Sequence, residues 1–226
     1  ALIRWIGADG KVVSPADFIP LAEETRLIVP MGQWVLDTAC QQLAQWQQHP
    51  ATRDLALAIN VSARQFHQAD FVAQVRAAIE RHAIAASGLK LELTESVILG
   101  DLDTTIERMH QLRALGLRFA LDDFGTGYSS LSYLKRLPFD QLKIDQSFIR
   151  DMLTDHSSNA IVRAILVMSE ALGLEVVAEG VETTAHRAFL VEHGCQFCQG
   201  YLLGRPVPIA TWEAAHLDAP ALPTTP

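Results

Sequence analysis

The sequence predicts an α/β fold in which parallel strands close into a (β/α)-barrel. Short runs rich in Leu, Ile, Val and Phe recur along the 226 residues, and segments with helical spacing of apolar residues separate most of them. The runs look too continuous for strands with one wet face, which favours buried parallel strands. An open doubly wound sheet would show a glycine-rich nucleotide-binding turn after its first strand, and the first run has none.

Seven strand-like runs support this class. They are ALIRWI (1–6), LALAIN (55–60), LKLELTE (89–95), LRFALDD (117–123), FDQLKID (139–145), LEVVAEG (174–180) and QFCQGYL (196–202). Residues 31–48 and 158–172 have helical periodicity. A barrel needs eight strands, and the chain opens inside a run without an initiator methionine, so we expect that an N-terminal part of the parent protein precedes Ala1. We expect one domain over residues 1–215 and a proline-rich tail over 216–226.

Composition excludes several classes of function. The net charge of −8, without a cluster of Lys or Arg, argues against binding to duplex nucleic acid. The most apolar long stretch, residues 160–180, is interrupted by Arg163, Glu170 and Glu175, so it does not predict a membrane span. Three cysteines, an odd number, argue against a disulfide framework and favour a cytoplasmic protein.

Polar residues stand where the predicted strands end. They are Asn60, Glu92, Thr94, Glu95, Asp122, Asp123, Lys143, Asp145, Glu179 and Gln199. In a barrel the carboxyl ends of the strands meet on one face, where barrel enzymes place their chemistry. Taken singly, an Asp or Asn at a strand end is more often a helix cap or a turn former.

The set as a whole predicts a metal site. Asp122 and Asp123 are adjacent at the end of a core strand, and two such carboxylates repel each other unless a cation or a proton compensates them. With Glu92, Glu179 and the Asn60 amide they form an oxygen-rich set, which Mg²⁺ or Mn²⁺ prefers. Carboxylates around two such ions are the arrangement that hydrolyses phosphodiesters.

Lys143 has two interpretations. It would stabilise negative charge that develops during the reaction. Alternatively, it would only form an ion pair with Asp145 or Glu179 at the mouth of the barrel. The glycine-rich segment after Asp123 predicts a loop from Gly125 to Gly127, with Ser129 or Ser130 capping the next helix. Such a loop beside the metals would close over substrate or respond to a partner.

Eight motifs then give a specific resemblance. They are ALIRW, FIPLAEE, NVSARQF, LELTES, DDFGTGYSSL, LKIDQSF, VVAEGVET and QGYLLGRP, in this order. The chain resembles the EAL domain family of bacterial cyclic di-GMP phosphodiesterases over nearly its whole length. The resemblance implies a modified TIM (β/α)8-type barrel with one antiparallel strand. It also implies hydrolysis of cyclic di-GMP to linear pGpG with two Mg²⁺ or Mn²⁺ ions, in second-messenger signalling that controls biofilms.

Carried onto this sequence, the resemblance implies a set of metal ligands and two further catalytic residues. The ligands are Asn60, Glu92, Asp122, Asp123 and Glu179, with Asp122 as the bridge between the ions. Lys143 would bind or orient the attacking water and the scissile phosphate. Gln199 would help to position the water.

The resemblance also implies residues around the ligands. Arg4 would contact a substrate phosphate, a task that suits a bidentate guanidinium. Asp145 and Glu182 would lie on the substrate-binding side, and Glu95 would position the loop 124–130. For Glu182 a helix-capping role at the start of the next helix is equally open.

One departure bears on activity. The glutamate in the family's name would immediately precede Ala1 and is not in this sequence, which leaves the first ion one carboxylate short and the activity of this fragment an open question. The alternative function is a catalytically inactive receptor for cyclic di-GMP on the same scaffold. The retained acids, Lys143 and the complete loop favour the enzyme. A sugar-processing or aldolase barrel would need a Schiff-base lysine, for which Lys143 alone is weak support.

The resemblance further implies partners. We expect a homodimer through helices near the loop 124–130, and an upstream sensory or GGDEF-type domain in the parent protein, with any membrane anchor in that upstream region. We expect Ca²⁺ to occupy the metal site and inhibit, because its loose coordination does not hold the water at the required angle.

Overall fold

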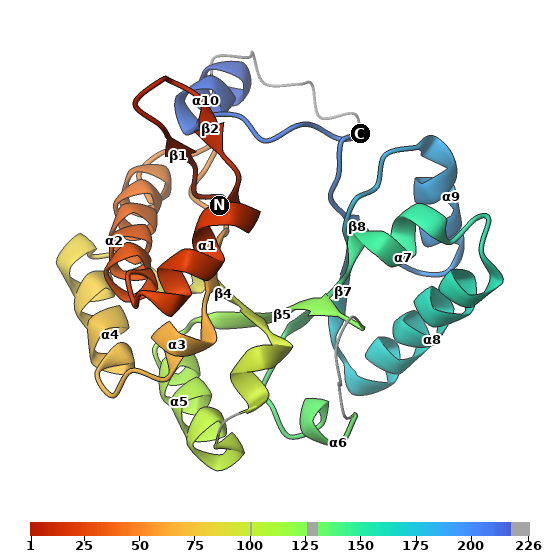
Figure 1. Ribbon diagram of the computed structural model, residues 1–226, viewed down its shortest axis with the longest axis horizontal. Coiled ribbons are helices and arrows are strands. Elements are labelled where there is room, and N and C mark those ends of the chain that lie inside the picture. The colour runs from red at the N-terminus through yellow and green to blue at the C-terminus, as the bar shows by residue number, and fades with distance from the viewer. Residues whose placement is uncertain (100, 126–130, 218–226) are drawn as a thin grey trace.

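The computed structural model describes residues 1–99, 101–125 and 131–217, and its centre is a six-stranded parallel sheet (Figure 1). The strands follow one another in sequence order, and they are β3 (Leu57–Val61), β4 (Leu89–Thr94), β5 (Arg118–Phe124), β6 (Gln141–Ile144), β7 (Glu175–Ala178) and β8 (Phe197–Cys198). A separate antiparallel pair joins β1 (Trp5–Ile6) to β2 (Val12–Val13). The α/β class is therefore confirmed.

One predicted strand is placed differently. The run 1–6 forms a strand only at its last two residues, and that strand pairs with β2 outside the parallel sheet. The turn after β1 explains this, because Gly10 has a positive φ of 78° and its N–H donates to the carbonyl of Gly7, which folds the chain back on itself. The other six predicted runs each contain one strand of the sheet.

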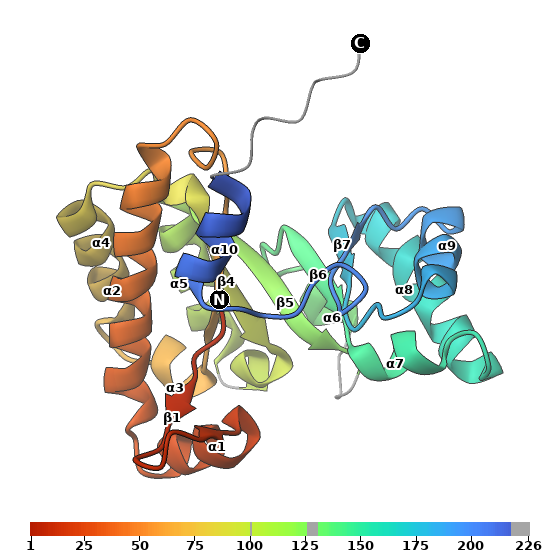
Figure 2. The same cartoon turned by 90° about the horizontal axis from the view of Figure 1, so that it is seen from above.

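Helices cover the outside of the curved sheet (Figures 1 and 2). They are α1 (Pro15–Glu24), α2 (Ile28–Gln47), α3 (Ala63–Phe66), α4 (Phe71–His82), α5 (Leu102–Ala114), α6 (Leu131–Leu134), α7 (Gln146–Asp151), α8 (His156–Leu172), α9 (Thr184–Glu192) and α10 (Ile209–Leu217), with 3₁₀ turns η1 (Ala86–Gly88) and η2 (Glu95–Leu99). The predicted helices at 31–48 and 158–172 match α2 and α8. Among the described residues, no helix has the length and hydropathy that crossing a membrane requires.

The last helix extends into the segment that was predicted to be a tail. α10 runs to Leu217, so it includes the first two residues of the segment 216–226. Residues 218–226 lie outside the described part of the chain. The division at residue 215 stays a prediction.

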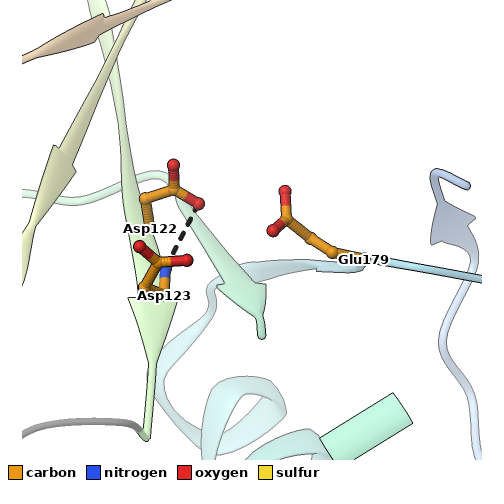
Figure 3. Close-up of side chains that lie close together, drawn as sticks. All are labelled: Asp122, Asp123 and Glu179. Atoms are coloured by element: carbon orange, nitrogen blue, oxygen red, sulfur yellow. Dashed lines mark hydrogen bonds between the residues drawn. The ribbon is translucent and has the colours of Figure 1, made fainter. Parts of the chain in front are cut away.

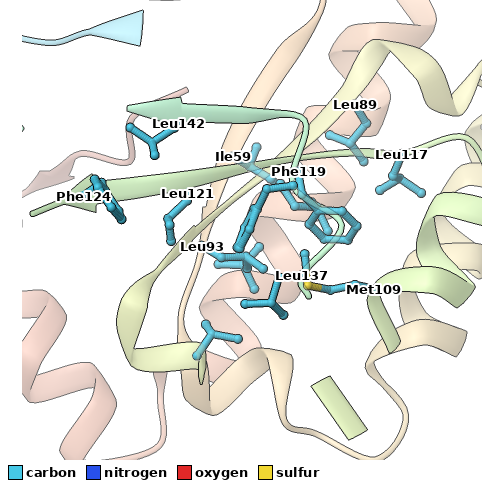
Figure 4. Packing of buried hydrophobic residues seen from close by; sticks show 14 of the residues in the cluster. Ile59, Leu89, Leu93, Met109, Leu117, Phe119, Leu121, Phe124, Leu137 and Leu142 are labelled. Carbon is cyan, nitrogen blue, oxygen red and sulfur yellow. The ribbon is translucent and has the colours of Figure 1, made fainter. Parts of the chain in front are cut away.

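Strand β4 has two different faces, which the sequence interpretation missed. In β4 the residues Leu89, Leu91 and Leu93 are fully buried, whereas the intervening Lys90 and Glu92 are half-buried. The leucine face packs with apolar residues of α2, α4 and α5 in one core (Figure 4). Burying each such side chain contributes about 1.5–3 kcal/mol to stability. The opposite face of β4 carries Lys90 and Glu92 and points into the barrel, so this strand alternates instead of being apolar on both sides.

Candidate active site

Three carboxylates, from β4, from β5 and from the residue that follows β7, surround one buried ammonium group. The Lys143 Nζ lies 3.1 Å from Glu92 Oε1, 2.8 Å from Asp122 Oδ1 and 2.6 Å from Glu179 Oε1. The Lys143 side chain is only 6% exposed, and the carboxylate side chains are 11–14% exposed. We call these four residues, together with Asp123, the carboxylate layer.

Strand register explains why these side chains meet. Parallel pairing places Glu92 beside Ala120, and Ala120 beside Gln141. Asp122 and Lys143 each lie two residues further along their strands, and residues two apart in a strand point to the same face. One register across β4, β5 and β6 therefore brings Glu92, Asp122 and Lys143 onto the same face of the sheet.

A β-bulge brings the second aspartate to the same side. Consecutive strand residues normally point to opposite faces, but the β5–β6 register shifts between Leu121 and Phe124, and Asp123 has a left-handed φ of 53°. Figure 3 shows the Asp122, Asp123 and Glu179 carboxyl groups near one another, and one carboxylate oxygen from each lies within 4.8 Å of the others. The bulge thus converts two neighbours in sequence into two neighbours in one site.

Burial and charge shift the pKa values of this layer. Burial alone would lower the pKa of Lys143, but Glu92, Asp122 and Glu179 outweigh it and raise that pKa. Burial raises the pKa of Glu179 to about 7, although the Lys143 ammonium opposes this. Burial, followed by the charges of Asp122 and Asp145, raises the pKa of Asp123. The layer therefore holds more negative charge than its ammonium compensates.

Gln199 and Glu95 both contact this part of the structure. The Gln199 amide donates a hydrogen bond of 2.6 Å to Glu179 Oε1. Glu95 accepts a 3.3 Å hydrogen bond from the backbone N–H of Gly125, the first residue after β5. The predicted loop continues through Gly127 to the capping serines, and residues 126–130 lie outside the described part of the chain.

Asn60 and Arg4 lie at a pocket beside the carboxylate layer. Asn60 is the register partner of Glu92, so its amide stands on the same face of the sheet. Together with Asp123 it lines a pocket of about 490 Å³, which Arg4 also lines. The Arg4 guanidinium donates to the carbonyl of Ile3 at 2.8 Å and is otherwise exposed to solvent.

Asp145 and Glu182 lie outside the carboxylate layer. Asp145 caps α7 by accepting a 2.9 Å hydrogen bond from the Ser147 N–H, and its carboxyl group also interacts with Asp123. Glu182 is exposed, and its charge adds only a small part to the raised pKa of Arg150, which comes mainly from Asp151. The capping role considered for Glu182 is wrong, because Thr183 is the N-cap of α9.

The two interpretations of Lys143 are partly resolved by its contacts. Lys143 does pair with Glu179, and it also pairs with Glu92 and Asp122. Asp145 is not among them, since its carboxylate caps α7.

Sequence reasoning missed a second polar layer, nearer the amino-terminal ends of the strands. Lys90 Nζ donates a 3.0 Å hydrogen bond to Gln141 Oε1, and the Gln141 amide donates to Glu175. We call Lys90, Gln141 and Glu175 the Gln141 layer. The lysine crosses β5 over Ala120, which is small enough to leave room. The alternating K-L-E of β4 was the available signal for this layer.

The pocket also includes residues that sequence reasoning left without a role. α1 and α2 supply apolar side chains to it, including Ile19, Pro20 and Met31. Gln65, which is buried, joins them from α3. The motif FIPLAEE, which supplies the first two, was the signal in the sequence.

The family model of the EAL domain matches residues 1–206 of the sequence. The chain belongs to the EAL domain family. It is 48% identical over 208 residues to the bifunctional diguanylate cyclase/cyclic di-GMP phosphodiesterase MucR of Pseudomonas aeruginosa. The aligned region covers 92% of this chain and 30% of MucR. It is 44% identical over 214 residues to the cyclic di-GMP phosphodiesterase NbdA of the same organism, which covers 94% of this chain and 27% of NbdA.

Solved structures agree with this assignment. The EAL domain superimposes on the PaMucR phosphodiesterase in complex with c-di-GMP with a TM-score of 0.88 at 47% identity, covering 92% of this chain and 84% of that one. The EAL enzyme Bd1971 in its cAMP-bound form gives a TM-score of 0.88 at 35% identity, covering 93% and 59%. These likenesses and the parallel sheet confirm the predicted TIM-like barrel. The chain spans less than a third of the length of MucR and NbdA.

Proposed function

We propose that this EAL domain hydrolyses one phosphodiester bond of cyclic di-GMP and releases linear pGpG, with two Mg²⁺ or Mn²⁺ ions as cofactors. The observation that supports the proposal most strongly is the approach of Asp122, Asp123 and Glu179 to within 4.8 Å through a bulge in β5. The naming of MucR and NbdA as cyclic di-GMP phosphodiesterases supports the choice of substrate.

The residues present fit a site for hard divalent cations. Asp122, Asp123 and Glu179 offer carboxylate oxygens that lie close together, and Glu92 and the Asn60 amide stand on the same face of the sheet. Oxygen donors of this kind suit Mg²⁺ and Mn²⁺ better than zinc or copper. When bound, such ions lower the pKa of a water molecule and neutralise phosphoryl oxygens.

The side chains of the EAL domain would orient the reaction. Lys143, held by three carboxylates, presents its positive charge where the phosphate gains negative charge. Gln199 fixes the orientation of Glu179 through the 2.6 Å hydrogen bond. Arg4 at the edge of the pocket would bind a substrate phosphate through its guanidinium.

Matched variants on one strand test this function. Using the full-length protein that contains this sequence, we would measure pGpG formed from cyclic di-GMP with Mn²⁺, and compare Glu179→Gln with Glu175→Gln. Both residues lie on the same face of β7 or just beyond its end, but only Glu179 belongs to the carboxylate layer. We expect Glu179→Gln to lower turnover by about a hundredfold or more, and Glu175→Gln to leave it within about threefold.

Other results of these assays would select a different function or a different site. Tight binding of cyclic di-GMP by the wild-type protein without pGpG formation would select the inactive receptor. Equal activity of both variants would reject the carboxylate layer as the catalytic site. Replacing Mn²⁺ by Ca²⁺ should leave metal binding intact and abolish turnover.

The assembly and location of the protein are also part of the proposal. We propose a cytoplasmic homodimer that forms through helices near the loop 124–130, in a parent protein with an upstream regulatory domain of the sensory or GGDEF type. MucR, whose name includes diguanylate cyclase activity, supports the last point. Sedimentation of the active protein as a monomer at all concentrations would contradict the dimer.

A further inference from the structure

The first turn of α7 lies between the two strand ends that supply the acids of the proposed metal site. The chain passes from Lys143 at the end of β6 through the cap Asp145 directly into this helix. One side of the turn contacts the end of β5, which holds Asp122 and Asp123, and the other contacts the segment after Glu179. The same turn therefore touches both halves of the carboxylate layer.

On the β5 side the contact is an aromatic ring against backbone. Gly125 has a φ of 98°, and a Cβ at this position would lie 2.9 Å from Cε2 of Phe148, so the ring packs directly on the glycine. Asp145, from the same turn, interacts with the Asp123 carboxyl group. Asp123 itself has a left-handed φ of 53°, a conformation that an L-residue keeps only when its surroundings hold it. Phe148 and Asp145 are two of those surroundings.

On the β7 side a glycine packs against the Cβ and Cα of Gln146. Gly180 has a φ of 69°, and a Cβ there would lie 2.6 Å from Cβ and 3.3 Å from Cα of Gln146. The preceding residue, Glu179, donates its backbone N–H to the carbonyl of Ile144 at 3.1 Å. Glu179 is therefore anchored to the end of β6 just before the chain meets α7.

We infer that the first turn of α7 is a spacer that sets the distance between the Asp122–Asp123 pair and Glu179, and that Phe148 is a positioning residue for the metal ligands. This inference rests on the proposed function. Phe148 acts through Gly125 and the bulge, without touching the ligand oxygens. Metal–ligand distances tolerate deviations of only about 0.2 Å, so a small relaxation of the bulge weakens binding. Residues that orient metal ligands typically change affinity or activity by about 10–100-fold when mutated.

The experiment compares two partly buried phenylalanines that pack against the same core. Phe148→Ala removes the ring from Gly125, Phe148→Leu keeps part of its volume, and Phe189→Ala on α9 is the matched control. Mn²⁺ affinity is measured by titration calorimetry on the full-length protein, with kcat, KM and the free energy of unfolding for each variant.

We expect Phe148→Ala to weaken Mn²⁺ binding by about tenfold and to lower kcat more than it raises KM, with Phe148→Leu in between. Phe189→Ala should lose comparable stability and keep the wild-type Mn²⁺ affinity. Wild-type Mn²⁺ affinity in Phe148→Ala would overturn the inference, as would an equal loss in Phe189→Ala.

A second measurement separates this inference from the proposed function. Without added metal, amide hydrogen exchange at Asp123, Phe124 and Gly125 should be faster in Phe148→Ala and unchanged in Phe189→Ala. If the wild-type protein neither binds Mn²⁺ nor hydrolyses cyclic di-GMP, the proposed function is wrong. The exchange comparison then still decides whether Phe148 holds the bulge, and unchanged exchange would reject that role.

Discussion

The two polar layers inside the barrel are built on the same faces of the same strands, yet their charges are arranged in opposite ways. In the Gln141 layer one ammonium and one carboxylate flank a neutral amide that hydrogen-bonds to both. In the carboxylate layer three carboxylates surround the ammonium of Lys143, and a fourth, Asp123, lies beside Asp122 and Glu179. The first arrangement is neutral and linked by hydrogen bonds, whereas the second holds excess negative charge.

The difference separates a structural role from a chemical one. A buried polar group that is fully hydrogen-bonded adds a modest amount to stability. Like charges held close together destabilise the fold unless a cation compensates them, so their presence indicates a site for one. Gln141 and Lys143 are only two residues apart on β6, yet they belong to different layers.

The largest difference between the layers should appear when the lysine of each layer is replaced by methionine. We expect Lys143→Met to lower the turnover of cyclic di-GMP by about 100–1000-fold, because the positive charge next to the reacting phosphate is lost. Lys90→Met should leave turnover within about threefold. Assays of pGpG formation, normalised to folded protein by circular dichroism, make the comparison. Similar losses in the two variants would show that the layers do not differ in function.

A smaller effect is expected from divalent cations on stability. Ligands that bind only the folded state stabilise it by about 2.7 kcal/mol at a hundred times their Kd, which for a chain of this size raises Tm by roughly 5–10 °C. Mn²⁺ should therefore raise the Tm of the wild-type protein and of Glu175→Gln. Asp122→Asn should lose most of that rise, because Asp122 belongs to the carboxylate group and Glu175 does not. Thermal unfolding with and without chelator measures it, and a full rise in Asp122→Asn would place the cation elsewhere.

Much of this comparison was visible in the sequence. The fold class and six of the strands follow from apolar runs, and the acids and Lys143 lie at or near the ends of those runs. The sequence analysis placed Asp122 and Asp123 in one metal site, but it did not predict the bulge that lets two consecutive strand residues face the same way, because the bulge depends on pairing with β6 and on contacts from α7. The role of Asp145 as a helix cap was the ordinary expectation for its type, and the structure confirms that role.

The Gln141 layer was missed for a different reason. Apolar and polar residues alternate in β4, but the polar positions of a barrel interior are covered, so they do not read as a wet face. Only the register across β4, β5 and β6 shows that Lys90 reaches Gln141 over Ala120.

The smallest effect on activity should come from the centre of the Gln141 layer. Gln141→Met removes the amide that hydrogen-bonds to Lys90 and Glu175 and leaves their charged groups without this partner. Because Lys90 is half-buried and Glu175 is exposed, water replaces part of the lost hydrogen bonding, and we expect the free energy of unfolding in urea to fall by about 0.5–1.5 kcal/mol. Turnover per folded molecule should stay within about twofold, since the carboxylate layer keeps all its contacts. A large loss of turnover without a loss of stability would mean that the Gln141 layer supports Lys143 directly, and the two layers would then act as one catalytic unit.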